Sequence, residues 1–402
     1  MTTVPRASPT DAMPLSDWFR RAPAAPNAVQ HAVMVVPPGA PTKQCLECRI
    51  TLPEAARFCF ICGGGLDAQV TSPFSGGDDA VIATLQARLN HALEGRYRVS
   101  DVLGKGGMGI VYLAADLHGG TPVAIKVLRP ELSNDEMGVA RFHREAEIAA
   151  SLKHDGIIPI RAVGSEQGLH YFVMDHVEGC SLDALLRSRK AEQRPLPVAA
   201  VARILGEAAL TLAYAHAQGV VHRDVKPANI MLDAESRVLL TDFGISKSAV
   251  ASTGATTAAA LTEYGTVLGT PHYLAPEQAL SRSVDGRADQ YALGVLGFEM
   301  LTGSVPFDDE TSHGIIHRHI NELPPRVTTL RPDVPEHIAS AIARALLKAP
   351  SHRFATMAEF ARAIDPDAAR RAHRWRRVLQ SAALLLAAAL IAAAAWASGI
   401  GR

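Results

Sequence analysis

The feature that most constrains the fold is a glycine-rich loop between two segments of β type. In YRVSDVLGKGGMGIVYLAAD, the glycines Gly104, Gly106 and Gly109 follow the order G-x-G-x-x-G, with alternating apolar residues on both sides. Glycines let a backbone approach phosphate groups closely. In a dinucleotide-binding fold a helix would follow the last glycine, whereas IVYLAA has the pattern of a strand. We therefore expect two antiparallel strands whose loop covers a nucleotide triphosphate.

A lysine stands inside the next β-type run. PVAIKVL places Lys126 and Ala124 on the same face of a strand. An ammonium among apolar side chains needs a carboxylate partner. The helical segment RFHREAEIAASL offers two, Glu145 and Glu147. In the alternative interpretation, Lys126 extends to solvent and the glutamates form a solvated helix face.

A short loop gathers polar residues between apolar runs. VVHRDVKPANIML contains Arg223, Asp224, Lys226 and Asn229, and a DFG triplet follows with Asp242. Carboxylates and an amide oxygen are groups that can hold Mg²⁺. A lysine can neutralise phosphate charge. Together with the glycine loop, this assortment indicates phosphoryl transfer.

These motifs, with APE at 275–277, occur in the order found in protein kinases. Over about 97–364 the chain resembles that family, and most closely the bacterial eukaryotic-like Ser/Thr kinases. The resemblance implies an α+β bilobal protein-kinase fold with a β-rich N-lobe and a helical C-lobe. It implies ATP and Mg²⁺ as cofactors, with Mn²⁺ as an alternative metal, and Ser/Thr hydroxyls of proteins as acceptors.

The resemblance also implies roles for single residues. Asp224 would accept or orient the proton of the acceptor hydroxyl, with Lys226 near the γ-phosphate. Lys126 would hold the α- and β-phosphates and pair with Glu145, while Asn229 and Asp242 would hold Mg²⁺. The implied nucleotide site contains Leu103, Gly104, Gly106, Gly109, Val111, Ala124, Lys126, the hinge residues Met174, Asp175 and Val177, and Met231 beneath the adenine ring.

Further positions match supporting parts of the family. GTPHYLAPE contains Thr270, which corresponds to a threonine of the peptide-binding loop, and this favours protein over small-molecule substrates. Asp289 resembles the aspartate that braces the catalytic loop, and Arg353 the arginine that pairs with Glu277. Two rival functions stay open: a pseudokinase scaffold that recruits partners through its N-terminal cysteine-rich segment, and a small-molecule phosphotransferase.

A Ser/Thr-rich segment follows the DFG triplet. Thr262 and Thr266 are candidate sites of autophosphorylation, and Arg223 would receive the phosphate through charge-assisted hydrogen bonds. The alternative is that both threonines are ordinary loop residues. A second run, SHGIIHRHI, contains His313, His317 and His319, for which we expect a surface helix and no metal site.

Four of the five cysteines form two C-x-x-C pairs, Cys45 with Cys48 and Cys59 with Cys62. Each pair can present two thiolates from one tight turn, and the intervening residues suffice for a hairpin around tetrahedral Zn²⁺. A redox dithiol pair and a disulfide are the alternatives, but structural disulfides are rare in cytosolic proteins. We therefore expect a closed, structural zinc ribbon.

The run 378–400 carries no charged residue and suffices to cross roughly 30 Å of hydrocarbon as a helix. Five arginines precede it, Arg370, Arg371, Arg374, Arg376 and Arg377, and Arg402 follows it. By the positive-inside rule we expect a single-pass protein of the inner (cytoplasmic) membrane with a cytoplasmic kinase domain, anchored in membrane lipid. The alternative is a helix packed on protein. External ligand sensing is not expected, and a homodimer through this helix is a further hypothesis.

The expected domains follow from these motifs. Lys+Arg (40) balance Asp+Glu (40), so no nucleic-acid partner is expected. The first segment lacks the apolar run of a secretion signal. The expected boundaries are 1–42 for a disordered Pro/Ala-rich tail, 43–66 for the zinc ribbon, 67–92 for a linker with a short helix, 93–366 for the kinase domain, 367–377 for a basic juxtamembrane segment and 378–400 for the transmembrane helix.

Overall fold

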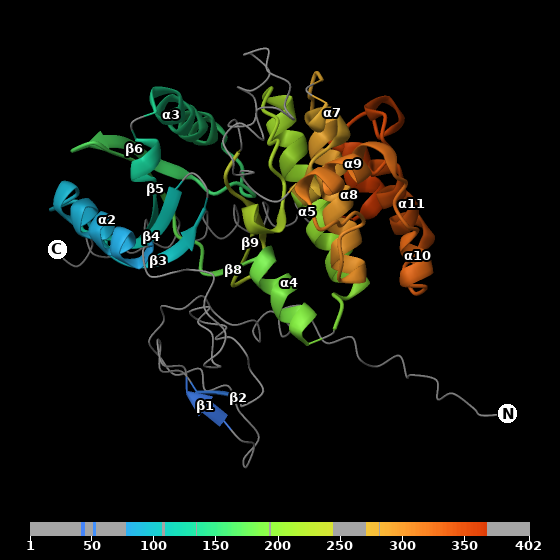
Figure 1. Cartoon of the computed structure of the whole chain (residues 1–402), viewed down its shortest axis with the longest axis horizontal. Coiled ribbons are helices and arrows are strands. Elements are labelled where there is room, and N and C mark those ends of the chain that lie inside the picture. The colour runs from blue at the N-terminus through green and yellow to red at the C-terminus, as the bar shows by residue number, and fades with distance from the viewer. Residues whose placement is uncertain are drawn as a thin grey trace, which may run out of the picture. The chain divides into compact units, whose positions relative to one another are not determined.

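The computed structural model describes residues 42–44, 51–53, 78–106, 109–133, 135–192, 194–243, 271–280 and 282–367 (Figure 1). The chain divides into two compact units, each built from several stretches. The first, which we call the sheet unit, takes residues 1–151, 158–180 and 231–237. The second, the helical unit, takes residues 152–157, 181–230 and 238–402. These are the sheet-rich and helical lobes of the bilobal fold expected from the sequence.

A five-stranded antiparallel sheet forms the centre of the sheet unit, in the order β3-β4-β5-β7-β6. The strands are β3 (Tyr97–Lys105), β4 (Gly109–Asp116), β5 (Pro122–Leu128), β6 (Ile160–Glu166) and β7 (Leu169–Asp175). Gly104 lies opposite Val111, so the glycine pattern forms the expected hairpin between β3 and β4. A strand follows Gly109, which rules out the dinucleotide-binding arrangement.

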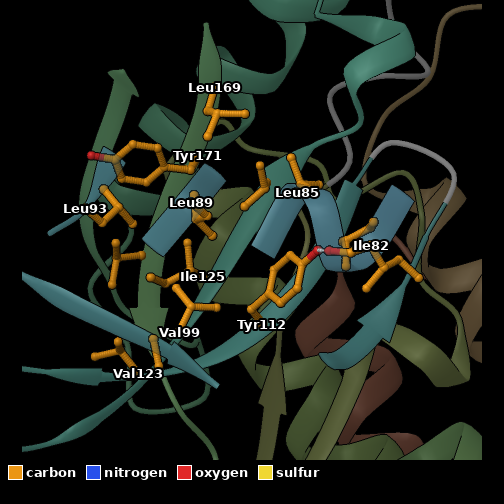
Figure 2. Packing of buried hydrophobic residues seen from close by; sticks show 14 residues of the cluster. Ile82, Leu85, Leu89, Leu93, Val99, Tyr112, Val123, Ile125, Leu169 and Tyr171 are labelled. Atoms are coloured by element: carbon orange, nitrogen blue, oxygen red, sulfur yellow. Dashed lines mark hydrogen bonds between the residues drawn. The ribbon is translucent and has the colours of Figure 1, made fainter. Parts of the chain in front are cut away.

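Helix α2 (Asp78–Ala92) covers one face of this sheet (Figure 2). Leu85 and Leu89 of α2 are almost fully buried, together with Ile125 of β5. The hydroxyl of Tyr112 donates a hydrogen bond of 3.1 Å to the backbone carbonyl of Ile82, and burial raises the pKa of this tyrosine to about 12. The short helix expected in 67–92 therefore belongs to the core of the sheet unit, and the packed body begins before residue 93.

The opposite face of the sheet packs against α3 (Glu136–Ser151), which follows the 3-10 helix η1 (Pro130–Leu132). Strand residues alternate between the two faces. Ile125 and Tyr171 therefore face α2, whereas Lys126 and Phe172 face the other way. The ring of Phe142 on α3 lies 5.1 Å from the ring of Phe172. The sheet is thus enclosed by a helix on each side.

The helical unit is built around α5 (Val198–Ala217) and α8 (Arg287–Thr302), which contact each other and α12 (Met357–Ile364). Tyr291, Leu293 and Phe298 of α8 are fully or almost fully buried. A Cβ atom on Gly297 would lie 2.8 Å from the side chain of Leu205, so this glycine allows α5 and α8 to pack closely. The helices are α4 (Leu182–Ala191), α5 (Val198–Ala217), α7 (Pro276–Ala279), α8 (Arg287–Thr302), α9 (Ser312–Asn321), α10 (Val327–Leu330), α11 (Glu336–Ala345) and α12 (Met357–Ile364).

Short elements complete the description. They are β8 (Gly179–Ser181), β9 (Ile230–Asp233) and β10 (Val238–Leu240), with the 3-10 helices η2 (Pro227–Asn229), η5 (Pro271–Tyr273) and η6 (Pro350–His352). Hydroxyl side chains cap three helices at their N-termini: Ser181 for α4, Thr311 for α9 and Thr356 for α12. These caps fix the residues at which α4, α9 and α12 begin.

Several expectations concern residues outside this description. Cys45, Cys48, Cys59 and Cys62 lie outside the described residues, as do Thr262, Thr266 and the run 378–400. Near the cysteines, β1 (Thr42–Gln44) pairs antiparallel with β2 (Thr51–Pro53). Within the described part of the chain, α5 is the one helix long and apolar enough to cross a membrane. Its residues Ile204 and Leu212 are fully buried in the helical unit. Such burial is typical of a core helix.

Candidate active site

The glycine loop lies at the tip of the β3–β4 hairpin. The backbone N–H of Gly106 donates to the carbonyl of Gly109 at 2.8 Å, which closes the tip. The guanidinium of Arg129 donates to the Gly106 carbonyl at 2.9 Å. A Cβ atom on Gly109 would lie 2.5 Å from the carbonyl oxygen of Val127, so only glycine fits there. The backbone of the glycine loop therefore packs directly against the backbone of β5.

The lysine and the glutamate predicted to pair do lie together. Lys126 Nζ is 3.5 Å from Glu145 Oε1, and the side chains are 9% and 5% exposed. The ammonium also lies 5.6 Å from the centre of the Phe172 ring. Glu147, the alternative partner, is exposed. A buried positive charge on β5 is thus matched by a negative charge that α3 supplies.

Four of the residues expected around adenine, Leu103, Val111, Ala124 and Met174, lie on strands of the five-stranded sheet, whereas Met231 lies on β9. Ala124 pairs in register with Met174, and both are buried. Val111 lies opposite Lys126 on the adjacent strand, half-buried like Leu103, Val177 and Met231. The side chain of Asp175 pairs with Arg161, and its backbone N–H donates to the carbonyl of Pro159. This carboxylate therefore fixes the end of β7.

The loop that contains Asp224 is held by a buried aspartate of α8. Asp289 is 1% exposed, and its carboxylate accepts hydrogen bonds from the backbone N–H groups of His222 at 2.9 Å and of Arg223 at 2.7 Å. Arg223 has a φ of 64°, in the left-handed region that costs energy for a residue with a side chain. The brace expected from the sequence is present, and it stabilises a strained turn.

Three polar side chains meet on this loop. Asp224 Oδ2 accepts a hydrogen bond from Lys226 Nζ at 2.7 Å and another from Asn229 Nδ2 at 3.1 Å. Asn229 Nδ2 also donates to the backbone carbonyl of Asp224 at 2.8 Å. Both amide hydrogens of Asn229 are directed to Asp224, which leaves its oxygen to accept or to coordinate. The carboxylate is therefore oriented, with a cation beside it.

Asp242 follows directly after a residue tied to this loop. The backbone N–H of Thr241 donates to the carbonyl of Asn229 at 3.1 Å. Asp242 has a φ of 56°, a second left-handed residue at the site. The ring of His222 lies 4.6 Å from that of Phe243. These contacts hold the HRD and DFG motifs side by side within the helical unit.

A buried ion pair closes the helical unit. Arg353 donates to both carboxylate oxygens of Glu277, at 2.7 Å and 2.9 Å, and the side chains are 0% and 4% exposed. Its other N–H groups donate to the backbone carbonyls of Leu347, Arg287 and Lys348. The neighbouring Gln278 donates to the carbonyl of Arg223 at 3.0 Å. The predicted pair therefore lies in a fully bonded network.

Some contributors had no clear signal in the sequence. His216 Nε2 lies 2.7 Å from Asp289, and Gly286 leaves room for that ring. Tyr273 donates to Glu299 at 2.6 Å, and burial is the first cause that raises the pKa of each group. In each pair the two residues lie far apart in the sequence, so no local pattern predicts the contact. The available signals are the histidine that precedes HRD and the tyrosine that precedes APE.

The expected helix is present as α9, with His313 and His317 exposed. His319, expected on a surface helix, is fully buried. Its Nδ1 lies 2.9 Å from the Tyr291 hydroxyl, and its ring lies 5.0 Å from Phe307. Burial lowers the pKa of His319 to about 3, so the ring stays neutral. Among the described residues, no group of three or more His, Cys, Asp or Glu side chains could hold a metal ion.

Comparison with known proteins identifies related chains. The family described as Protein kinase domain matches residues 97–363. A serine/threonine-protein kinase PrkC of Bacillus subtilis is 38% identical over 279 residues, which cover 68% of this chain and 41% of that protein. A serine/threonine-protein kinase PknB of Mycobacterium leprae is 37% identical over 271 residues, covering 66% of this chain and 42% of the relative. The matched region thus spans less than half of the length of these relatives.

Solved structures show the same likeness. The crystal structure of the Mycobacterium tuberculosis PknI kinase domain is 33% identical in sequence, with a TM-score of 0.53. The likeness covers 68% of this chain and 96% of that one. The chain therefore contains the length of a whole kinase domain.

Proposed function

Because the chain belongs to the protein kinase family, we propose that it transfers the γ-phosphoryl group of ATP to Ser/Thr hydroxyls of proteins. The observation that carries the proposal is the arrangement of Asp224, with Lys226 Nζ at 2.7 Å and the amide of Asn229 at 3.1 Å. The acceptor oxygen must lose its proton as it attacks phosphorus. An oriented carboxylate can take that proton, while a neighbouring ammonium offsets charge on the phosphate.

The residues present also suit a nucleotide with Mg²⁺. When bound, the metal neutralises phosphate charge, and Mn²⁺ is an alternative. The Asn229 oxygen and the Asp242 carboxylate are the ligands we assign to it, because hard cations take oxygen ligands. We assign Lys126 to the α- and β-phosphates, with Glu145 orienting its ammonium group. The glycine loop supplies backbone N–H groups for the remaining phosphate oxygens.

The adenine site in this proposal is apolar. Ala124 and Met174 are buried neighbours on β5 and β7, and Val111 lies on the adjacent strand. Leu103, Asp175, Val177 and Met231 complete the assignment, with the backbone of the segment after β7 as the hydrogen-bonding partner. An apolar surface with few backbone polar groups is what a flat heterocycle requires.

Three further parts of the proposal rest on the sequence. Thr262 and Thr266 are proposed autophosphorylation sites, with Arg223 as the phosphate-binding residue. The four cysteines are proposed to hold structural Zn²⁺, which metal analysis of the purified chain with and without their alanine replacement would test.

The run 378–400 is proposed as an anchor in the inner membrane and as the contact of a homodimer. Membrane fractionation and sizing of the full chain, beside a chain that ends at residue 367, test both roles.

The transfer reaction is tested by incubating the purified chain with labelled ATP, Mg²⁺ and a general protein acceptor. We expect label on phosphoserine and phosphothreonine in the chain and in the acceptor. Asp224→Asn should lose this label, whereas Asp101→Asn, an exposed aspartate on β3, should retain it. Nucleotide binding without transfer would instead indicate a scaffold, and consumption of ATP with a metabolite alone would indicate a small-molecule phosphotransferase.

A further inference from the structure

Two histidines that the proposed mechanism does not use meet between α3 and the sheet. His143 Nε2 of α3 and His170 Nδ1 of β7 are 3.1 Å apart, and their ring centres are 5.2 Å apart at 88°. Both side chains are half-buried. At this distance one nitrogen donates a hydrogen and the other accepts it. The contact therefore requires that at least one ring is neutral.

The contact lies beside the ion pair of the candidate site. His143 precedes Glu145 by two residues on α3, and His170 precedes Phe172 by two residues on β7. Phe172 is the register partner of Lys126. Because His143 and Glu145 lie on one helix, a shift that separates α3 from β7 at His143 would also move Glu145 relative to Lys126. In protein kinases this lysine–glutamate pair must be in place for transfer.

The charged groups on β6 and β7, the two strands that α3 contacts, pair with groups of opposite charge. On β6, Arg161 pairs with Asp175, and Glu166 pairs with Arg96. On α3 itself, Arg144 and Glu147 are both exposed to solvent. Burial is the first cause that lowers the pKa of His170, and the charge of His143 is the second. Protonation of His170 is therefore opposed by its burial and by a charge on His143.

We propose that the contact between His143 and His170 positions α3 so that Glu145 reaches Lys126, and that protonation of both rings releases the helix. With both rings protonated, each nitrogen carries a hydrogen, so the hydrogen bond is lost and two like charges face each other. The two histidines are positioning residues, because they act through Glu145. This inference rests on the proposed function for its effect on transfer.

The direction of the pH effect follows from the pKa of His170. A histidine whose pKa is lowered by folding stabilises the folded arrangement above its ordinary value of about 6.5, and this stabilisation is lost as the pH falls through the lowered value. The contact should therefore be intact at neutral pH and fail on the acid side of the ordinary histidine range.

The first test compares the pH dependence of transfer in wild type with that of neutral replacements. His170→Asn and His143→Gln place an amide near the ring nitrogen that each replaces, so they keep a hydrogen bond that protonation cannot remove. Between neutral pH and pH values below about 6, wild type should lose about 5-fold more transfer activity than His170→Asn, a ratio at the low end of measured couplings. His91→Asn, an exposed histidine on α2, should follow wild type.

The second test needs no catalysis. Hydrogen exchange of the peptide 136–151, corrected for the intrinsic effect of pH, should quicken in wild type as the pH falls and stay slow in His170→Asn. If no variant transfers phosphate at any pH, the proposed function fails while this exchange measurement still decides the inference. Equal exchange and equal acid sensitivity in wild type and His170→Asn would overturn the positioning role.

Discussion

Two buried ion pairs, one in each unit, are built for different purposes. In the helical unit, Arg353 binds Glu277 through two hydrogen bonds of 2.7 Å and 2.9 Å and directs its other N–H groups to backbone carbonyls. In the sheet unit, Lys126 and Glu145 are 3.5 Å apart and join a strand to a helix. The first pair stabilises the fold of the helical unit. The second depends on where α3 lies, so under the proposed function it can control the state of the site.

The same contrast extends to the surroundings of each pair. Asp289, Gln278 and the strained Arg223 fix the catalytic loop from within one unit through hydrogen bonds. In the sheet unit, α3 contacts the sheet through rings, through the histidine pair and through the ion pair of Glu145 with Lys126. The loop with Asp224 is therefore held by several hydrogen bonds, while the partner of Lys126 comes from a helix that packs on the sheet. Regulation of a kinase needs such an element.

The largest effect should come from breaking the structural pair. Arg353→Leu leaves the Glu277 carboxylate buried without its partner, which typically costs about 3–5 kcal/mol of folding free energy. Denaturant unfolding of the full chain measures this loss. Arg187→Leu is the matched control, because Arg187 is 74% exposed and its pair with Asp183 should contribute less than about 1 kcal/mol. Similar losses in both variants would contradict the distinction.

The next effect concerns the helix that covers the sheet. Leu89 is 0% exposed, so Leu89→Ala removes buried methyl groups and should lower the free energy of unfolding by about 2–5 kcal/mol. Leu117→Ala, at a leucine that is 43% exposed, should change it by less than about 0.5 kcal/mol. An unaffected Leu89→Ala variant would show that α2 is an appendage to the sheet and not part of its core.

A smaller loss of stability should accompany the loss of the brace on the catalytic loop. Asp289→Asn keeps the shape of the side chain but weakens the acceptance of two backbone N–H groups, at a cost of about 1–3 kcal/mol. Transfer activity should fall more than stability does, since the loop carries Asp224. Asp285→Asn, in the exposed turn before α8, serves as the control. Steady-state rates beside unfolding curves separate the two effects.

The smallest change in stability should come from the adjustable pair. Glu145→Gln keeps the volume and an acceptor oxygen near Lys126, so the free energy of unfolding should fall by only about 1 kcal/mol. Transfer should nevertheless fall about 10-fold or more, as expected when a charge that acts on the phosphate-binding lysine is removed. Glu147→Gln, exposed on the same helix, should match wild type in both measurements. A stability loss as large as that of Arg353→Leu would erase the contrast.

Contacts between motif residues could be predicted well, because the chemistry of the site fixes which residues must meet. Lys126 with Glu145 and Arg353 with Glu277 are pairs that the family resemblance implies, and each pair is in contact. The brace from Asp289 to the catalytic loop is likewise present. Such contacts recur because the same phosphate and the same loop must be held wherever the fold occurs. The family also supplied the division into a sheet-rich and a helical unit.

Other features depend on residues that no local pattern connects. The apolar positions of α2 predict an amphipathic helix, but its burial depends on Tyr112 and Ile125, which lie on strands later in the chain. His319 looks like the neighbouring histidines of its run. Its burial depends on Tyr291 and Phe307, which lie on other parts of the helical unit. A single sequence predicts the helices and not the surfaces that cover them.

The central claim is that the loop with Asp224 performs transfer while other residues hold the nucleotide. The most direct measurement compares wild type and Asp224→Asn for both the affinity for Mg²⁺–ATP and the rate of phosphate transfer at saturating nucleotide. We predict affinities within about 3-fold of each other and a rate lower by about 100-fold or more, the range expected when a positioned proton acceptor is removed. Transfer at the wild-type rate in Asp224→Asn would contradict the account.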